Sequence, residues 1–323
     1  MKSLKLNVLT KEEMDMIHAA TLQVLAEPGI LINHPKSREL CKAAGCDVNE
    51  QTKVVKFPAQ LVEDCLKKCP SNFTLYSRDG KKDVKMTGDG SVTNYTTFGI
   101  GVKSTNYVSP GVYETRASTL QDIREMAKVV DACNNVDEIC QPVTALDYAT
   151  ADCCRTIREV DAVMDNTVKP FWQDTEWQYM DLYYDYMVAV YGGDKEMARK
   201  KPFMMPCGCP SSPLQIDFAA AQIYTDSYTY GMPVMVLSMA MGAASSPIHL
   251  AGTLVTHNAE VVAGIVLAQL AHPGCPVVYG SSTTSFDFFC NSAPVGSPEL
   301  GLISAGVASL AQYYNIPSTT AGV

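Results

Sequence analysis

A regular alternation of short apolar segments with longer helical segments, from residue 119 onward, limits this chain to few folds. Most of the apolar segments are about five or six residues long, and two of them begin with Lys-Pro-Phe. Short apolar strands that alternate with helices are typical of a parallel sheet that is covered by helices. The predicted strands of this region are 138–143, 169–173, 201–207, 233–238, 276–281 and 315–323.

The number of strands favours a barrel over an open sheet. A further strand near residue 95 brings the predicted total to seven, whereas a parallel α/β barrel needs eight. A doubly wound open sheet is the structural alternative, but no glycine-rich first turn supports it. We therefore predict an α/β fold of the (β/α)8 TIM type that is incomplete at its C-terminus, because the last strand, Ser318–Val323, has no helix after it.

The part of the chain before the predicted barrel has helical patterns without the alternation of strands and helices, and we divide the chain at residue 72. Residues 1–72 are predicted to form an N-terminal helical segment, whose first helix begins at Thr10 with Glu13 three residues later, the pattern of a capping box. Residues 73–323 are predicted to form a partial barrel domain that lacks its last strand and helices. Within it, Asp79-Gly80 indicates a hairpin turn.

Composition excludes several classes of protein. The formal net charge is −9, and no cluster of lysine and arginine suits a nucleic-acid partner. The longest apolar tracts, 232–244 and 261–270, are too short or too interrupted to span a membrane, and the first ten residues lack the pattern of a signal peptide. We therefore expect a cytoplasmic protein whose twelve cysteines are mostly buried, reduced thiols.

The candidate site residues lie at the carboxyl ends of the predicted strands, where the functional groups of parallel α/β barrels are found. The predicted substrate-binding residues are Tyr95, Phe98, Gln141, Trp172, Gln173, Ser238, Tyr279, Ser281 and Asp287. Aromatic rings in this set, together with Phe286, would suit a methylated ammonium ion held by cation–π attraction. Core packing is the alternative interpretation of the same aromatic residues.

These strand ends lack the groups of a hydrolytic site. None of the five histidines is predicted at a strand end, so neither a histidine-based triad nor a hydrolytic zinc site is favoured. Cys207-Gly-Cys209 could bind a thiophilic metal but has no partner histidine, and we predict no metal. Glu299 fits the first turn of a helix, and Asp287 among phenylalanines needs a partner. No catalytic residue can be assigned.

Several motifs resemble the trimethylamine methyltransferase family along essentially the whole chain. The most specific of them is Gly296-Ser-Pro-Glu299. The others are Val277–Thr284, Ile303–Ala308, Tyr313–Ser318, Leu9–Met14, Ala19–Gly29, Cys207–Pro210 and the region of Gln173. The resemblance implies an α/β barrel that is longer than this chain, a methylated amine as the substrate, and methylamine metabolism of the methanogenic type.

The resemblance also implies the partners and the catalytic residue. Family members of this type transfer a methyl group from trimethylamine to the Co(I) of a cognate corrinoid protein, so the corrinoid is carried by the partner and no cofactor is bound directly. Their catalytic pyrrolysine, encoded by an in-frame amber codon, is expected just after Val323. On this reading the chain alone should be inactive and poorly soluble, and the full-length protein should be a homo-oligomer.

Two alternatives remain open at this point. Pyrrolysine-free relatives act on quaternary amines such as glycine betaine, and the chain could also be a non-catalytic module that binds methylated amines or a corrinoid protein. The sequence does not separate a tertiary from a quaternary amine, and the codon after Val323 would distinguish the alternatives.

Overall fold

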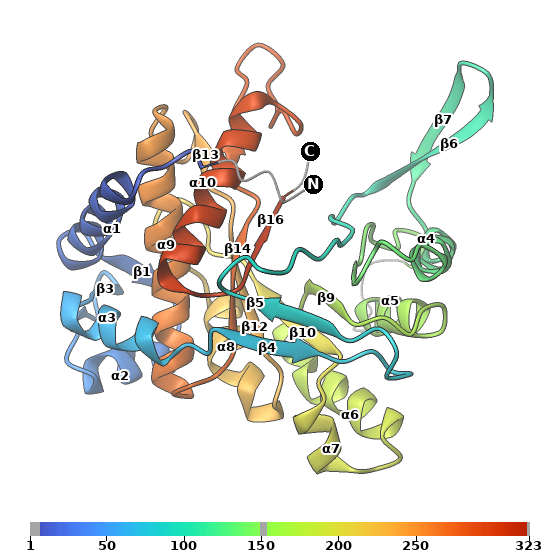
Figure 1. Ribbon diagram of the computed structural model, residues 1–323, viewed down its shortest axis with the longest axis horizontal. Coiled ribbons are helices and arrows are strands. Elements are labelled where there is room, and N and C mark those ends of the chain that lie inside the picture. Colours follow the sequence, from blue (N-terminus) through green and yellow to red (C-terminus); the bar gives the residue numbers. More distant parts are fainter. Residues whose placement is uncertain (1–6, 149–153, 322–323) are drawn as a thin grey trace.

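The centre of the protein is a curled parallel sheet of six strands (Figure 1). The structure is a computed structural model that describes residues 7–148 and 154–321. The strand order is β16–β14–β12–β10–β9–β8, and every neighbouring pair is parallel, which confirms the parallel sheet predicted from the alternation. The strands are β8 (Ile139–Cys140), β9 (Phe171–Asp174), β10 (Met204–Gly208), β12 (Val234–Ser238), β14 (Val277–Ser281) and β16 (Ser318–Thr320).

The strand predicted near residue 95 is the exception. Residues 92–101 run beside β8 but make only two isolated parallel bridges to this region, Thr96 with Glu138 and Gly101 with Val143. Gly99 passes so close to the chain that a Cβ there would lie 2.5 Å from the carbonyl oxygen of Pro142. This close approach and the low strand propensity of glycine explain why residues 92–101 form an irregular segment in place of the strand predicted near residue 95.

Helices cover the outer face of the sheet in two groups. One group packs on β12, β14 and β16, and the other packs on β8, β9 and the start of β10. The first consists of α8 (Phe218–Asp226), α9 (Leu250–Ala271) and α10 (Pro298–Tyr314), and the second of α4 (Leu120–Ala132), α5 (Cys154–Met164) and α6 (Met180–Val190), with the short α7 (Lys195–Lys200) beside it. Helix α9 is long and apolar enough to span a membrane, but 72% of its most apolar window is buried, as in the core helix of a globular protein.

A separate cluster of side chains fills the inner, concave face of the sheet. Alternate strand residues point inward, among them Trp172, Cys207 and Val278. The hairpin β4 (Asn72–Leu75) and β5 (Val84–Thr87) packs against this cluster, with the predicted turn at Asp79-Gly80. In Figure 1 this hairpin crosses in front of the sheet. Gly88, just after it, lies against the backbone of Asn315, where a Cβ would be 2.4 Å from the carbonyl carbon.

The N-terminal segment contains the three predicted helices, and it also contains short strands that the sequence did not predict. Helices α1 (Lys11–Ala26), α2 (Pro35–Ala43) and α3 (Ala59–Lys68) alternate with three short strands, which form a small sheet with a strand from the barrel region. These are β1 (Ile30–Ile32), β2 (Asp47–Asn49) and β3 (Val54–Lys56), joined by β11 (Gln215–Ile216). The capping box of Thr10 and Glu13 is confirmed.

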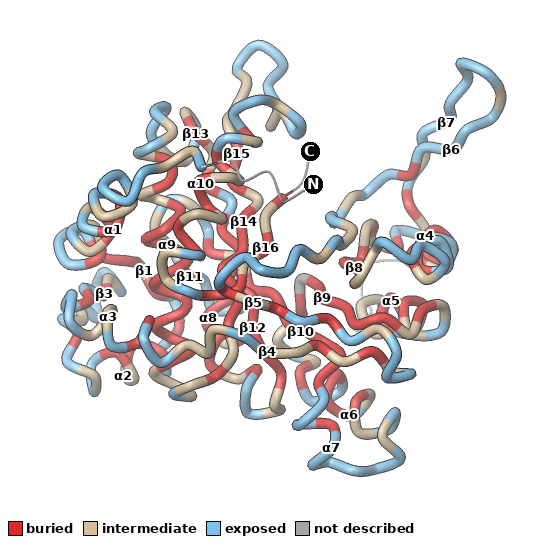
Figure 2. Tube along the Cα trace, in the orientation of Figure 1, coloured by how far each residue is buried: buried red, intermediate tan, exposed pale blue. Residues whose placement is uncertain are grey.

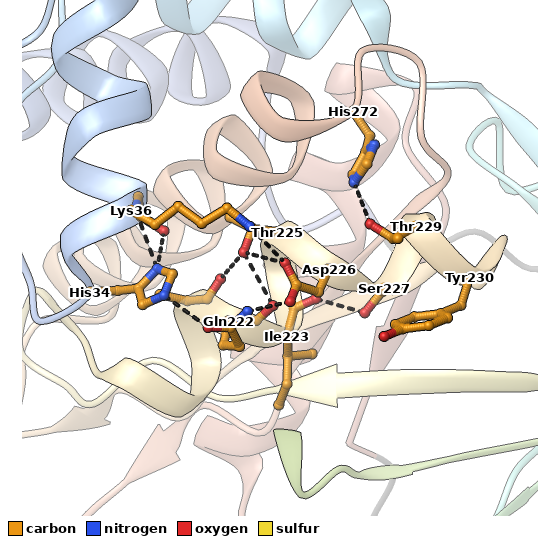
Figure 3. Close-up of polar contacts among 12 residues, drawn as sticks. His34, Lys36, Gln222, Ile223, Thr225, Asp226, Ser227, Thr229, Tyr230 and His272 are labelled. Atoms are coloured by element: carbon orange, nitrogen blue, oxygen red, sulfur yellow. Dashed lines mark hydrogen bonds and ion pairs between the residues drawn. The ribbon is translucent and has the colours of Figure 1, made fainter. Parts of the chain in front are cut away.

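Polar contacts join the N-terminal segment to helix α8 (Figure 3). His34 faces Ser37 through Nδ1 and Gln222 of α8 through Nε2, at 2.7 and 2.9 Å. Lys36 lies 3.6 Å from the carboxylate of Asp226, at the end of the same helix. Burial lowers the pKa of His34, so this histidine is a neutral hydrogen-bonding residue of the interface at neutral pH.

Two further strand pairs lie beyond the main sheet. Strands β13 (Met241–Gly242) and β15 (Thr284–Ser285) pair in parallel above the carboxyl ends of β12 and β14. Strands β6 (Lys103–Ser109) and β7 (Val112–Ala117) form a hairpin that projects from the body of the protein (Figure 1). Figure 2 shows that this hairpin is exposed, whereas the main sheet and α9 are buried. The 3-10 helices Trp177–Tyr179 and Ser227–Tyr230 complete the described elements.

Candidate functional site

Three of the predicted aromatic residues lie at the edge of the sheet next to β8, and two of them, Trp172 and Phe98, are in ring contact. The indole Nε1 of Trp172 donates a hydrogen bond of 3.1 Å to the hydroxyl of Thr96, and its ring centroid lies 5.8 Å from that of Phe98. Tyr95 and Phe98 belong to the irregular segment and are 63% and 40% exposed, whereas Trp172 is buried. An apolar aromatic wall with solvent access is therefore present at this edge.

A cavity of about 380 Å³ lies between this segment and strand β16, at the open side of the curled sheet. Its wall includes Tyr95 and Thr96 on one side and β16 on the other, and Glu138 also lines it. The other lining residues are Met86, Thr87, Gly88, Gly90, Val92, Thr93, Asn94, Ala308, Gln312 and Pro317. Hydroxyl and amide groups thus surround a carboxyl group in a partly enclosed space.

Glu138 is the most perturbed acid of this region. It is 2% exposed, and its Oε2 atom has no hydrogen-bond partner among the described residues. Burial, with a smaller contribution from the neighbouring charge of Asp137, raises the pKa of Glu138 to about 8. This burial could not be predicted from the sequence, because a single glutamate at the start of a strand is normally solvated.

This raised pKa predicts a pH-dependent stability. Glu138 is ionised in the unfolded chain above its ordinary value of 4.5, whereas the folded state holds the proton until about pH 8. The contribution of Glu138 to the free energy of unfolding is therefore most favourable below pH 4.5, and it is lost as the pH rises towards 8. We expect the free energy of unfolding to fall by about 2 kcal/mol between about pH 6 and about pH 8.

Urea unfolding at a series of pH values measures this effect, and Glu138→Gln should remove it, because the amide does not titrate. Asp137 is the charged group that acts on Glu138, and Asp137→Asn serves as the comparison. If the free energy of unfolding falls with pH in Glu138→Gln as steeply as in the unaltered protein, another titrating group is responsible.

Four predicted site residues face the helices and not the concave side of the sheet. Tyr279 donates a hydrogen bond of 2.6 Å to Asn258 of α9, and Ser238 donates one of 2.6 Å to Glu260 of the same helix. Ser281 is paired in register with Ser238, and Gln173 lies next to Tyr183 of α6. Successive strand residues alternate between the two faces of a sheet, so these four side chains point away from the inner face. Their role in substrate binding stays a prediction.

The remaining predicted residues have local structural contacts. The carboxylate of Asp287 accepts hydrogen bonds from the backbone N–H groups of Phe289 and Cys290, which lower its pKa. These two backbone N–H groups are the partners that the Asp287 carboxylate needs among its aromatic neighbours. The buried amide of Gln141 donates to the carbonyl of Val143 at 3.0 Å. Gly322, also at a predicted strand end, lies outside the described residues.

Two buried residues of α9 reach the carboxyl ends of the strands and were not predicted. Glu260 accepts hydrogen bonds from Ser212, Ser238 and the backbone N–H of Leu214, at 2.6 to 2.9 Å. His257, one turn earlier, contacts the hydroxyl of Thr283 at 2.8 Å, and burial lowers its pKa to about 3. The signal that could have found them is that His257 and Glu260 are the two titratable residues of the mostly apolar run 255–270.

The described part of the chain contains no group of three or more histidine, cysteine, aspartate or glutamate side chains that could hold a metal ion. Cys207 is buried on the inner face of the sheet, whereas Cys209 lies in the loop that lines a second cavity of about 400 Å³. None of the ten cysteines whose side chains are described forms a disulfide.

Comparison with known proteins identifies relatives along the whole chain. The chain is 48% identical over 323 residues to trimethylamine methyltransferase MttB1 of Methanosarcina mazei and 47% identical to MttB of Methanosarcina barkeri. It is 31% identical over 325 residues to glycine betaine methyltransferase of Desulfitobacterium hafniense. The whole of this chain aligns with the first two relatives and 98% of it with the third, and it spans 65%, 65% and 64% of their lengths.

Solved structures support the fold. Monomethylamine methyltransferase (MtmB) of Methanosarcina barkeri matches with a TM-score of 0.55 at 13% sequence identity, over 95% of this chain and 66% of that chain. A complex of MtmB with hydroxylamine matches equally well. Residues 2–323 match the family described as trimethylamine methyltransferase (MTTB). The chain therefore belongs to the trimethylamine methyltransferase family.

Proposed function

We propose that the protein to which this chain belongs transfers a methyl group from trimethylamine to a cognate corrinoid protein. The observation that carries this proposal is the difference in identity between two kinds of relative. Relatives named as trimethylamine methyltransferases from Methanosarcina are 46 to 48% identical to the chain, whereas the one named as a glycine betaine methyltransferase is 31% identical. Such a protein would act in the cytoplasm, in methylamine metabolism of the methanogenic type.

We also propose that the curled sheet is part of a (β/α)8 barrel, with residues 1–72 as a separate N-terminal segment. The support is the position of the cavity between β16 and residues 92–96, which are the two lateral edges of the curled sheet. A further strand beside β16 would occupy this open side and pair with its unpaired edge. The 65% share of the relatives' length that the chain spans is consistent with a larger barrel in those relatives.

In the proposed reaction, the aromatic wall binds the substrate. Phe98, in contact with the buried Trp172, and Tyr95 have exposed rings that would attract an alkylammonium ion. Their rigid placement, with the Trp172 indole held by Thr96, would orient one methyl group for transfer. The proposal assigns Trp172, Phe98 and Tyr95 binding and orientation only.

The corrinoid belongs to the partner and supplies the cobalt that accepts the methyl group. Residues on the carboxyl side of the sheet fit the docking of such a partner, because the loop after β15 exposes large apolar side chains. Phe288, Phe289 and Val295 are 70, 98 and 76% exposed there. Exposed apolar residues grouped in this way are typical of protein-binding surfaces. No residue of this chain is assigned as catalytic.

The test is methyl transfer by the complete gene product with its corrinoid partner. The gene is sequenced past the Val323 codon and expressed with and without an amber-suppressing pyrrolysine system, and methylation of the Co(I) corrinoid is followed by absorbance. The proposal expects activity with trimethylamine and little with glycine betaine. Faster methylation by glycine betaine, with a sense codon after Val323, would support the quaternary-amine alternative, which the 31% identical relative motivates.

A matched pair of tryptophan variants tests the proposed wall. Trp172→Leu should raise the KM for trimethylamine about tenfold, since a cation–π contact contributes about 1 kcal/mol or more in a desolvated site. Trp177, the other tryptophan, lies in the outer layer against Phe218. Trp177→Leu should leave the KM unchanged. Equal effects of the two substitutions would remove Trp172 from the proposed site.

A further inference from the structure

Helix α2 ends in a turn that brings two cysteines of the N-terminal segment together. The helix ends at Ala43, and the left-handed backbone of Gly45 (φ +92°) then folds the chain back. The N–H of Gly45 donates to the carbonyl of Lys42 at 3.1 Å, and the N–H of Cys46 donates to the carbonyl of Cys41 at 3.0 Å. These two bonds define a Schellman motif, in which the side chains of the first and last residues commonly touch.

The contact of such a motif usually joins two apolar side chains, whereas here it joins two thiols. Cys41 is 0% exposed and Cys46 is 7% exposed. A hydrogen bond from the Cys41 thiol lowers the pKa of Cys46, and burial opposes this shift. Bond lengths and the 3.0 Å hydrogen bond between the two backbones keep the Cα atoms within about 7 Å of each other. That distance is within the reach of a disulfide.

The other close pair of cysteines in this segment, Cys65 and Cys69, lacks this geometry. Cys65 lies within α3 and Cys69 follows its last residue. The thiol of Cys69 donates to the backbone carbonyl of Cys65 at 3.5 Å, so it is directed at the helix backbone. Burial raises the pKa of both thiols. This pair therefore serves as an internal control for cysteines that only pack in the core.

Cys46 is the thiol of its pair that a reagent in solution reaches first. The residues on either side of it, Gly45 and Asp47, are exposed, and a Cβ at Gly45 would have no atom within 4 Å. Cys41 lies behind it in the core that α2 and α3 form with α9. A thiol just beneath the surface with a lowered pKa, next to a buried second thiol, is the arrangement of an attacking and a resolving cysteine.

We propose that Cys41 and Cys46 are a redox-active dithiol that small-molecule disulfides oxidise by thiol–disulfide exchange. The Cys46 thiolate attacks one sulfur of the disulfide RSSR, which breaks the S–S bond, releases one RSH after protonation and leaves Cys46–S–SR. The Cys41 thiol then loses its proton and attacks the Sγ atom of Cys46, which releases the second RSH and forms the Cys41–Cys46 bond. The protein loses two electrons and two protons, which reduce RSSR to two RSH.

The reverse reaction with RSH restores both thiols, so the site responds to the ratio of disulfide to thiol around the protein. A crosslink between the ends of the Schellman motif fixes the end of α2 and the turn that leads into β2. The site does not depend on the proposed methyl transfer, and its test uses no activity.

The experiment equilibrates the complete purified protein, without oxygen, in mixtures of reduced and oxidised glutathione. After an acid quench, free thiols are blocked with N-ethylmaleimide and the protein is digested with trypsin, which cleaves after Lys42 between the two cysteines. The oxidised site gives peptide 39–42 linked to peptide 43–53, detected by mass spectrometry. We expect this link to grow with the share of oxidised glutathione and to exceed a Cys65–Cys69 link about tenfold or more, because only the first pair has disulfide geometry.

Three variants test the order of the steps. Cys41→Ala should accumulate glutathione on Cys46, whereas Cys46→Ala should leave Cys41 unmodified. Cys65→Ala, in the same core, should not change the yield of the link. The unaltered protein decides the proposal even if a variant does not fold. The proposal is overturned if the Cys41–Cys46 link is no more abundant than the Cys65–Cys69 link, or if it forms only after urea has unfolded the protein. Glutathione on Cys41 in Cys46→Ala would overturn the order of attack.

Discussion

Replacement of Lys169 by methionine is expected to lower the free energy of unfolding by about 3 kcal/mol. Lys169 is 1% exposed, and its ammonium group donates to the backbone carbonyls of Val130, Cys133 and Val136. The Val130 carbonyl lies in the last turn of α4, and those of Cys133 and Val136 lie in the turn that follows it; the first two also accept a backbone N–H. The lysine therefore supplies the donors that end this helix.

The loss of stability follows from the hydrogen bonds that the lysine makes and that methionine cannot make. Burial lowers the pKa of Lys169, which means that the buried charge has a cost. Three charge-assisted hydrogen bonds and the favourable interaction with the negative end of the helix dipole outweigh that cost. Methionine fills a similar volume but donates nothing, so three carbonyls would each lose a charge-assisted hydrogen bond, at about 1 kcal/mol each.

Urea unfolding followed by tryptophan fluorescence measures this change. Lys128→Met is the matched control, because Lys128 lies on the exposed face of the same helix, and its effect should stay within about 0.5 kcal/mol. If the two variants were equally stable, the cost of burying the charge would cancel the three bonds, and the helix end would not depend on Lys169.

The positions of the strands could be predicted from the sequence, but the direction of their side chains could not. In Val277–Ser281 both faces are buried, so Val277 and Val278 look alike although one faces the helices and the other the inner cluster. A parallel strand covered on both sides has no polar face that fixes its register. For this reason the sequence places Tyr279, Ser281 and Ser238 at strand ends but does not show which face of the sheet their side chains take.

The short strands of the N-terminal segment and the buried carboxylates were missed for different reasons. Strands of three residues, such as Ile30–Ile32, are below the length at which alternation can be recognised. Glu138 and Glu260 depend on tertiary structure, since only the folded chain places one beside a cavity and the other beneath two strand ends. The family motifs did identify the family, because they do not require knowledge of side-chain direction.

Replacement of Glu260 by alanine is expected to have the largest effect on stability, about 4 kcal/mol. Its side chain is fully buried and connects two loops that leave the sheet at neighbouring strands. It accepts from the hydroxyl of Ser212 and the N–H of Leu214 in the loop after β10, and from the hydroxyl of Ser238 at the end of β12. Alanine would leave a buried backbone N–H without a partner and a cavity in place of the carboxylate.

Glutamine separates the loss of the acceptors from the loss of the charge. Burial raises the pKa of Glu260, although its three hydrogen bonds oppose that shift. Glu260→Gln retains one acceptor oxygen and the shape of the side chain, and we expect it to cost about 1 to 2 kcal/mol. Glu125→Ala, on the exposed face of α4, is the control for a general effect of removing a helical glutamate.

A second readout tests the proposed link between the loops. Proteolysis under native conditions should cleave the segment 209–216 faster in Glu260→Ala than in Glu260→Gln, because the alanine variant releases the loop from β12 as well as lowering global stability. Comparison at urea concentrations that equalise the global stability of the two variants isolates the local effect. Equal cleavage rates under those conditions would mean that Glu260 stabilises the core without holding the loop, and that the carboxyl edge of β10 is positioned by the pairing of β11 with β1 alone.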